Sequence, residues 1–218
     1  MEGEKGVGKI IISEMFISVQ GEGPQIGMIS WFIRTSGCNL SCDYCDSKYA
    51  KDGTEMTIKD IVDAVYYSPC KNVVITGGEP FIQKDLLKLI KALGDARIYV
   101  ETNGTIYDPQ LIGYAQFIVS PKPQFMNDKY MESLKKWKTH GTFKFVVGNR
   151  EEFDIAKDLA IKLGLHKGYT NVYFMPKGTD GDTINDIMIS LVEWCKEEPW
   201  IRISTRLQIQ LYGNKRGV

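Results

Sequence analysis

Three cysteines lie close together in one short segment of the sequence. Cys38, Cys42 and Cys45 follow the strand-like run Trp31-Phe32-Ile33-Arg34 and are surrounded by Gly, Asn and Asp residues. Thiolates this close in a flexible loop can converge on one soft metal centre. A structural zinc site needs four ligands, whereas a four-iron cluster held by three thiolates keeps one iron open for a small ligand. The spacing therefore favours an iron–sulfur cluster.

Two other readings of the cysteines remain open at this point. Cys70 or Cys195 could complete a zinc site, or Cys42 and Cys45 could form a redox pair. A redox pair normally opens a helix in a compact unit, which suits neither a preceding third cysteine nor such a polar loop. Free cysteine is often buried, so we expect Cys70 and Cys195 to be buried core thiols.

A glycine-rich turn follows a β-branched run. The run Val73-Val74-Ile75 continues into Thr76-Gly77-Gly78-Glu79-Pro80. The glycines allow a sharp turn or close approach of a ligand, Pro80 ends the strand, and Glu79 could receive an ammonium group. Alone, the segment is better explained as a tight strand-to-helix turn. Downstream of a cysteine triplet, it indicates a ligand site.

The elements that must position these residues alternate between strands and helices from about residue 57. Helical spacing or caps predict helices near 57–65, 86–93, 129–138, 150–163 and 185–196, with a further helix start at Asp108-Pro109. β-branched and aromatic runs predict strands at 73–76, 98–100, 117–119, 143–147 and 172–174. This alternation predicts an α/β fold with a parallel sheet, and the units are too few for a closed eightfold barrel. We expect an incomplete, open (β/α) barrel in a single domain, residues 1–218.

Unusual residues gather where the predicted strands end. Four such segments are Thr76 to Pro80, Glu101 to Gly104, Ser120 to Pro123 and Met175 to Gly178. Functional groups of parallel α/β folds lie at the carboxyl ends of strands. We therefore expect the four segments to face one site.

Composition narrows the classes of function. Of the 218 residues, 43% are hydrophobic, and 27 basic residues balance 27 acidic ones. This chain has no net positive field to attract nucleic acid or an anionic membrane. It also contains no apolar run of about 18 to 20 residues and no signal-peptide pattern at its start. We expect a cytoplasmic protein without nucleic-acid or membrane partners, with residues 3–8 as an irregular start.

The cysteine spacing followed by Gly-Gly-Glu-Pro resembles the radical S-adenosylmethionine (radical SAM) superfamily. The resemblance implies a modified radical SAM core in which Cys38, Cys42 and Cys45 hold a 4Fe-4S cluster. S-adenosylmethionine (SAM) would chelate the open iron through its amino and carboxylate groups. The residues implied to bind SAM are Tyr44, Cys45, Asp46, Gly78, Glu79, Ser120, Pro121, Lys122, Met175 and Pro176.

Further segments are similar to the 7-carboxy-7-deazaguanine synthase family. They are the run from Val19 to Pro24, Arg34, Cys45-Asp46-Ser47 and the ending from Leu211 to Val218. The resemblance implies a carbon–nitrogen lyase that converts 6-carboxy-5,6,7,8-tetrahydropterin to 7-carboxy-7-deazaguanine with loss of ammonia, in queuosine- or archaeosine-type biosynthesis. The radical would form on the cofactor and take hydrogen from C6, so no protein residue is implied as the catalytic group.

The same resemblance implies a substrate site, a metal ion and partners. Ser47 would bind Mg²⁺, in place of the threonine of many members, and the chain would form a homodimer served by an electron donor such as flavodoxin or ferredoxin. Gln208 stands where the family often has histidine, so no histidine contact carries over. The residues implied to bind the pterin are Val19, Gln20, Gly21, Glu22, Arg34, Thr76 and Val218.

Two alternatives of other classes remain. An activase that generates a glycyl radical on a partner protein would share the cluster and SAM motifs, but it would not explain the run Gln20 to Gly23 or the terminal motif. A zinc-binding module without enzymatic activity is the third reading. Iron content and turnover of the pterin distinguish the three.

Overall fold

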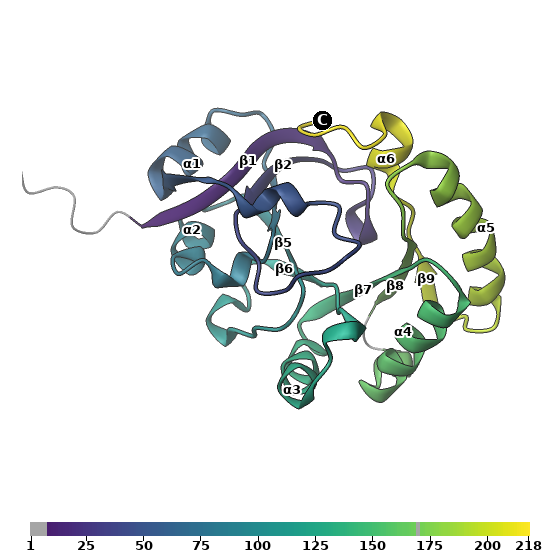
Figure 1. The fold of residues 1–218 in the computed structure, drawn as a ribbon. Coiled ribbons are helices and arrows are strands. Elements are labelled where there is room, and N and C mark those ends of the chain that lie inside the picture. Colours follow the sequence, from purple (N-terminus) through teal and green to yellow (C-terminus); the bar gives the residue numbers. More distant parts are fainter. Residues whose placement is uncertain (1–7, 169–170) are drawn as a thin grey trace, which may run out of the picture.

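The computed structural model describes residues 8–168 and 171–218, which form one nine-stranded sheet surrounded by helices (Figure 1). The expectation for residues 3–7 lies outside this description. In sheet order, the strands are β3 (Thr54–Thr57), β1 (Lys9–Val19), β2 (Ile29–Thr35), β4 (Asn72–Gly77), β5 (Arg97–Thr102), β6 (Gln116–Val119), β7 (Gly141–Val147), β8 (Val172–Pro176) and β9 (Ile201–Ile203).

The helices cover the outer face of this sheet (Figure 1). Side chains of Thr57, Asn127, Asn149 and Asp180 accept hydrogen bonds from backbone N–H groups in the first turns of the helices that follow them. None of the helices in the described residues is long and apolar enough to cross a membrane. The helices are α1 (Ile58–Tyr66), α2 (Leu86–Ala92), α3 (Asp128–Trp137), α4 (Arg150–Lys162), α5 (Gly181–Lys196) and α6 (Leu207–Tyr212).

The predicted architecture is confirmed. Pairing is parallel from β2 through β9, and in the described part of the chain β3 and β9 form the two edges, so the barrel is open. The helix expected at Asp108-Pro109 is wrong in type: Asp108 caps a single 3-10 turn, Pro109–Leu111. The prediction also missed β1, β3, β9 and α6. β1 pairs antiparallel with both β2 and β3, outside the strand-helix rhythm, and a bulge between Ile12 and Glu14 interrupts its alternation.

Alternation along each strand separates an outer core from an inner face. On β4, Val73 and Ile75 belong to the large core beneath the helices, whereas Val74 faces the barrel interior. The inner apolar layer consists of Phe32, Val74, Tyr99 and Ile118. Two residues further along each of these strands, the inward positions become polar and line a cavity: Arg34, Thr76, Glu101 and Ser120. The apolar layer thus closes the floor of a polar site.

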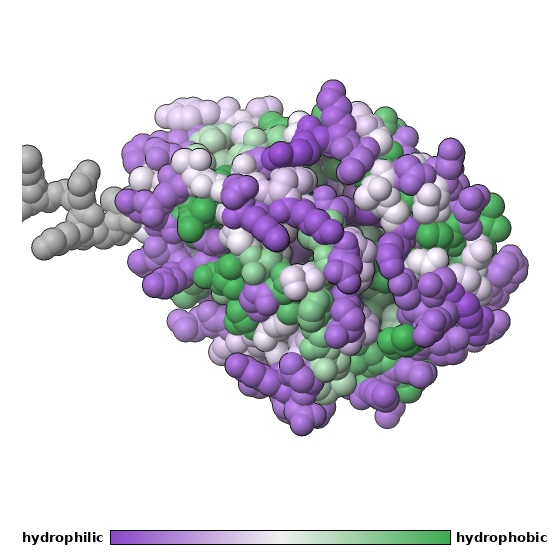
Figure 2. Space-filling view, viewed as in Figure 1, coloured by the Kyte–Doolittle hydropathy of each residue, from purple (hydrophilic) through white to green (hydrophobic). Residues whose placement is uncertain are grey.

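The segment joining β2 to β3, residues 36–53, crosses the open mouth of the barrel (Figure 1). We call it the cysteine loop. On this face, hydrophilic side chains predominate around the periphery, and hydrophilic and less polar ones are mixed nearer the centre (Figure 2). The loop begins beside the turn after β4, where Gly78 N donates to Thr35 O over 3.2 Å and Glu79 N donates to Gly37 O over 2.9 Å.

Gly78 is required where these two turns meet. A Cβ at Gly78 would lie 1.8 Å from the backbone oxygen of Gly37, which cannot turn aside as a flexible side chain could. We therefore expect Gly78→Ala to force the two turns apart and to lower the free energy of unfolding by about 1 to 3 kcal/mol, the usual cost of overpacking. Urea denaturation measures the change.

Gly181→Ala is the matched control. Gly181 is the first residue of α5, and a Cβ added there would have no other atom within 4 Å, so alanine should be neutral or mildly stabilising. A Gly78→Ala protein as stable as the Gly181→Ala protein would contradict the close approach of the two turns.

Candidate active site

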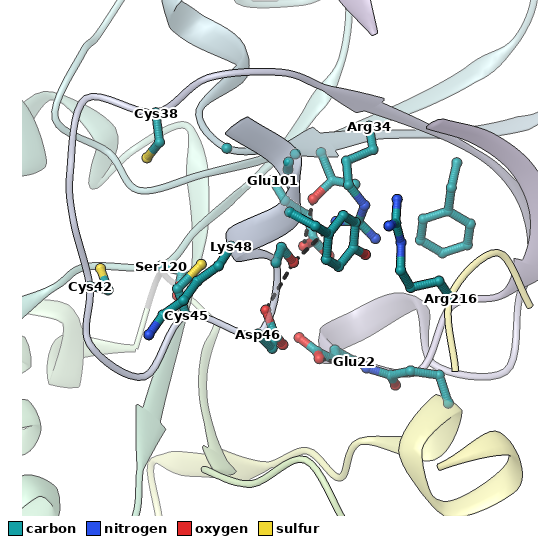
Figure 3. Close-up of a pocket in the computed structure, with 18 of the residues that line it drawn as sticks. Glu22, Arg34, Cys38, Cys42, Cys45, Asp46, Lys48, Glu101, Ser120 and Arg216 are labelled. Atoms are coloured by element: carbon teal, nitrogen blue, oxygen red, sulfur yellow. Dashed lines mark hydrogen bonds between the residues drawn. The ribbon is translucent and has the colours of Figure 1, made fainter. Parts of the chain in front are cut away.

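A cavity of about 510 Å³ lies at the carboxyl ends of the parallel strands, between the cysteine loop and the C-terminal segment. Cys38 and Cys42 lie toward one end of it, and Arg34, Arg216 and Glu22 lie toward the other (Figure 3). Residues predicted from the sequence that line this one cavity are Val19, Gln20, Gly21, Glu22, Arg34, Cys38, Cys42, Tyr44, Cys45, Asp46, Ser47, Thr76, Gly78, Ser120, Lys122, Met175 and Val218.

Three predicted SAM-binding residues do not reach the wall of this cavity. Ser120 and Lys122 line the cavity while Pro121 between them does not, and Met175 lines it while Pro176 does not. The physical reason is that neighbouring residues of an extended segment point to opposite sides. Glu79 is fully buried, and its carboxylate binds other protein groups.

Glu79 ties the turn after β4 to the end of β5. Its Oε1 accepts hydrogen bonds from Phe81 N at 3.1 Å and Thr102 Oγ1 at 2.8 Å, and its Oε2 accepts one from Asn103 N at 2.7 Å. Burial raises the pKa of Glu79 to about 7, although these hydrogen bonds oppose the rise. The carboxylate is therefore a structural connection between two strand ends.

The three thiols line one wall of the cavity. Burial raises the pKa values of Cys38 and Cys42, and Lys122 opposes that rise at Cys42. Among the described residues, no three His, Cys, Asp or Glu side chains gather closely enough to hold a single metal ion. A four-iron cluster has its irons at separate corners, so its thiolate ligands need not meet at one point. Three soft ligands on one loop, all lining one cavity, fit such a cluster.

The opposite end of the cavity is a buried ionic network, which we call the polar end and define as Gln20, Glu22, Glu101, Lys144 and Arg206. Lys144 is only 3% exposed, and its Nζ lies 2.7 Å from Glu22 Oε2 and 3.6 Å from Glu101 Oε1. Gln20 Nε2 donates to Glu101 Oε1 over 3.0 Å, and Arg206 Nε donates to Glu22 Oε1 over 3.0 Å.

The network keeps Glu22 and Lys144 charged despite their burial. Burial by itself would raise the pKa of Glu22, but Lys144 and Arg206 hold it far below its ordinary value. Burial would lower the pKa of Lys144, but Glu101 and Glu22 raise it. Buried charges are tolerated when they are paired and hydrogen-bonded in this way.

Arg206 connects the polar end to the cysteine loop. Besides Glu22, its guanidinium binds the carboxylate of Asp46 and the backbone oxygen of Gly178. Gln208, two residues later, donates from Nε2 to Glu22 Oε1 over 2.7 Å. The N-terminal segment, the cysteine loop, the end of β8 and the C-terminal segment thus meet at one arginine.

Arg34 is oriented by Glu14. Arg34 Nε donates to Glu14 Oε1 over 2.7 Å, and its Nη1 lies 3.5 Å from Ser47 Oγ. Tyr49 also donates to Glu14 Oε1, over 3.0 Å, and the Arg216 guanidinium stacks on the Tyr49 ring at 3.7 Å. Two arginines therefore face the same part of the cavity, where they could bind an anionic ligand.

Sequence reasoning assigned no role to Lys144, Arg206, Glu14 or Glu101. Lys144 carried a usable signal, because it is the single charged residue in the apolar run Phe143-Lys144-Phe145 and so occupies the inward side of a strand. Glu101 lies in one of the strand-end segments that are predicted to face the site. Arg206 and Glu14 have no such local pattern, since only the fold brings them to their partners.

The two isolated cysteines differ from each other. Cys195 is buried, as expected, and burial raises its pKa to about 11. The expectation of a buried thiol is wrong for Cys70, which is partly exposed. Cys70 lies in the loop before β4, and its Sγ lies 3.3 Å from the carbonyl oxygen of Ile29, the first residue of β2, and 3.6 Å from Asn72 O, rather than in the core. Neither residue lines the cavity.

Comparisons with known proteins show what the chain is similar to. A family model described as the Radical SAM superfamily matches residues 32–188. Three relatives named 7-carboxy-7-deazaguanine synthase are similar to the chain. The one from Rhodopirellula baltica is 32% identical over 95% of this chain and 88% of the relative, and the one from Clostridium acetobutylicum is 31% identical over 95% of this chain and 98% of the relative. The one from Pyrobaculum aerophilum is 33% identical over 96% of this chain and 97% of the relative.

Two solved structures share the fold. QueE from Escherichia coli is 24% identical with a TM-score of 0.70, covering 90% of this chain and 93% of that one. SuiB from Streptococcus suis, in a structure with bound S-adenosylmethionine, is 14% identical with a TM-score of 0.55, covering 77% of this chain and 44% of that one.

The raised pKa of Glu79 makes stability depend on pH. Because the folded-state pKa of about 7 exceeds the ordinary value of 4.5, the folded chain binds more protons than the unfolded chain between these values. Glu79 therefore contributes stability that is fully present below pH 4.5 and is lost as the pH rises through 7. The loss amounts to roughly 3 kcal/mol.

Glu79→Gln removes this titration. The difference between the free energy of unfolding of the variant and that of the wild type should therefore rise by roughly 2 to 3 kcal/mol between pH 5 and pH 8. Urea denaturation of the metal-free chain at a series of pH values measures it. Glu132→Gln, on the exposed side of α3, is the control, since Lys135 lowers the pKa of Glu132. Parallel pH profiles for the wild type and Glu79→Gln would show that Glu79 titrates normally.

Proposed function

Because the chain belongs to the radical SAM superfamily and, within it, to the 7-carboxy-7-deazaguanine synthase family, we propose that it converts 6-carboxy-5,6,7,8-tetrahydropterin to 7-carboxy-7-deazaguanine with loss of ammonia. It is a radical SAM enzyme, and we assign its product to queuosine- or archaeosine-type biosynthesis. The observation that carries the assignment is a single cavity that has three thiols at one wall and a polar, arginine-flanked end at the other. The names of the relatives favour this reaction over the glycyl-radical activase.

The cofactors belong at the cysteine wall. Cys38, Cys42 and Cys45 would hold the 4Fe-4S cluster, which together with SAM supplies the radical that takes hydrogen from C6 of the substrate. Gly78 lines this wall of the cavity, where the methionine part of SAM would lie. Side chains available to enclose SAM from the strand ends and the loop are Tyr44, Asp46, Ser120, Lys122 and Met175. Glu79, Pro121 and Pro176 would support these strand ends from behind.

The pterin belongs at the polar end. Arg34, held by Glu14 through Nε, would present its remaining N–H groups to the substrate carboxylate. Gln20, Glu22 and Thr76 would pair with the donor and acceptor edges of the ring. Glu22 suits a ring N–H, because Lys144 and Arg206 keep it ionised. Val19, Gly21 and Val218 would complete the enclosure that excludes water from the radical.

A magnesium ion would join the substrate to the cysteine loop. Ser47 Oγ lies 3.0 Å from Asp46 Oδ1 and 3.5 Å from Arg34 Nη1, so an ion at Ser47 would lie beside the arginine that binds the carboxylate. Mg²⁺ commonly takes one or two protein oxygens and keeps several waters. The Asp46 carboxylate beside Ser47 would offset the charge of the ion, and this supports the assignment of Ser47 as its protein ligand.

We further propose that residues 1–218 act as one domain in a cytoplasmic homodimer that receives electrons from flavodoxin or ferredoxin. Continuity of the sheet from β3 to β9 supports a single domain. Ile17 and Ile29 support an assembly of two copies, since they are 43% and 55% exposed on neighbouring strands.

Replacing any one of Cys38, Cys42 and Cys45 by alanine should abolish the broad visible absorption of the cluster and all cleavage of SAM, because two thiolates cannot hold four irons securely. Iron and sulfide analysis of anaerobically reconstituted protein, with the visible spectrum, measures the first effect. Cys70→Ala and Cys195→Ala are matched controls and should keep the wild-type iron content. A full cluster in Cys42→Ala would contradict the assignment.

Arg34→Ala and Ser47→Ala should impair ring contraction more than they impair background cleavage of SAM, because only the pterin depends on these groups. We expect product formation to fall on the order of 100-fold, the usual consequence of a misplaced reacting group. Chromatography of both products, with and without added Mg²⁺, measures the split. Ser41→Ala removes a hydroxyl from the same loop and serves as the control. Parallel loss of both products, or an intact magnesium response in Ser47→Ala, would reject this substrate site.

A further inference from the structure

Asn103 lies behind the cysteine loop, where the functions assigned above do not use its side chain. It follows β5 and is only 7% exposed. Its Oδ1 accepts hydrogen bonds from Thr105 N, over 2.9 Å, and from Thr105 Oγ1, over 2.6 Å. Because Oδ1 is held on the Thr105 side, the Nδ2 end of the amide faces the cysteine loop.

That amide end binds the segment that carries the first cysteine. Asn103 Nδ2 donates to Asn39 Oδ1 over 2.9 Å, and Asn39 Nδ2 in turn donates to Thr105 Oγ1 over 2.7 Å. Asn39 directly follows Cys38. The Cys38 sulfur accepts a hydrogen bond from Leu40 N over 3.4 Å, so Asn39, which Asn103 holds, lies between the first cysteine and the residue that donates to its sulfur.

The turn that carries Asn103 is fixed from the opposite side. Its backbone N–H donates to Glu79 Oε2 over 2.7 Å, and its carbonyl accepts a hydrogen bond from the Tyr130 hydroxyl of α3. Ser133 Oγ of the same helix donates to Gly104 O over 2.8 Å. The backbone of the turn is therefore held by buried hydrogen bonds, and turning the amide away from the cysteine loop would break both bonds of its Oδ1 to Thr105.

We propose that Asn103 is a positioning residue that sets the reduction potential of the cluster: its side-chain N–H holds Asn39, and so keeps the Leu40 N–H directed at the Cys38 sulfur. The inference rests on the proposed function, since it concerns the same cluster. A hydrogen bond to a ligating sulfur stabilises the negative charge that the site gains on reduction, and hydrogen bonds to the sulfurs are among the determinants of cluster potentials. Asn103 therefore makes the cluster easier to reduce.

The test is a redox titration of the anaerobically reconstituted full chain, followed by the electron paramagnetic resonance signal of the reduced cluster. Asn103→Leu removes the donors at similar size, and Asn103→Asp keeps the shape and the Oδ1 acceptor but removes the N–H groups and adds negative charge. Both should make the midpoint potential more negative. A roughly tenfold loss in the reduction equilibrium corresponds to about 59 mV for a one-electron couple.

Asn149→Asp is the matched control. It makes the same Asn-to-Asp substitution at the N-cap of α4, and Asn149 does not line the cavity. A negative shift in both Asn103 variants, with wild-type iron content and no shift in Asn149→Asp, supports the proposal. If Asn103→Leu does not retain its cluster, the isosteric Asn103→Asp protein decides the question.

Unchanged potentials in cluster-containing Asn103 variants would overturn the role of Asn103, as would an equal shift in Asn149→Asp. A wild-type chain that binds no cluster would instead contradict the proposed function itself. Iron content and midpoint potential therefore separate the two failures.

Discussion

The pairing of Lys144 with Glu22 and Glu101 inside the barrel is the constraint on which the polar half of the site depends. A lysine that is almost completely buried is stable only beside carboxylates, and removing one partner from a buried ion pair leaves an uncompensated charge. The strands β5 and β7 and the segment after β1 must therefore keep their spacing. Arg206 extends the same network to the C-terminal segment and, through Asp46, to the cysteine loop. The network thus fixes the polar wall and anchors one side of the thiol wall.

The other side of the cysteine loop depends on a different kind of contact. Around Gly37 and Cys38, the loop rests on backbone hydrogen bonds from the turn after β4, and Glu79 joins that turn to Asn103. Here hydrogen-bond donors hold the carboxylate, and no arginine or lysine of the described residues is bonded to it, so burial raises its pKa. Glu22, beside two cations, has a lowered pKa. Two buried glutamates in one site therefore have opposite electrostatic characters, and this separates a structural carboxylate from one that can face a ligand.

The separation of the site into a polar end and a thiol wall suits a reaction whose demanding chemistry belongs to the cofactors. The protein contributes placement, orientation and exclusion of water, so rigid strand ends matter more than any one acid or base. The open barrel provides such ends from β2 to β8, the apolar layer of Phe32, Val74, Tyr99 and Ile118 closes the floor, and the cysteine loop covers the mouth. A small flat anion at the polar end and a cofactor at the thiols would then share one enclosure.

Local patterns in the sequence were sufficient to predict the parallel open barrel and the four strand-end segments that face one cavity. The assignment of the three cysteines as cluster ligands stays a prediction, and most other residues of the cavity wall were expected from the resemblance to known families. Alternation of strand and helix is a short-range signal, and parallel strands place their carboxyl ends on one side whatever their order. Tertiary structure alone decided which neighbours at a strand end face inward, so that Ser120 and Lys122 line the cavity while Pro121 does not. It also decided the partners of Glu79, the pairing of Glu22 with Lys144 and Arg206, and the antiparallel position of β1. The physical reason is that no local periodicity or propensity specifies a partner at such distances along the chain. Glu79 and Thr102 are 23 positions apart, Glu22 and Lys144 are 122 apart, and Glu22 and Arg206 are 184 apart. The energy of a buried charge depends on that partner.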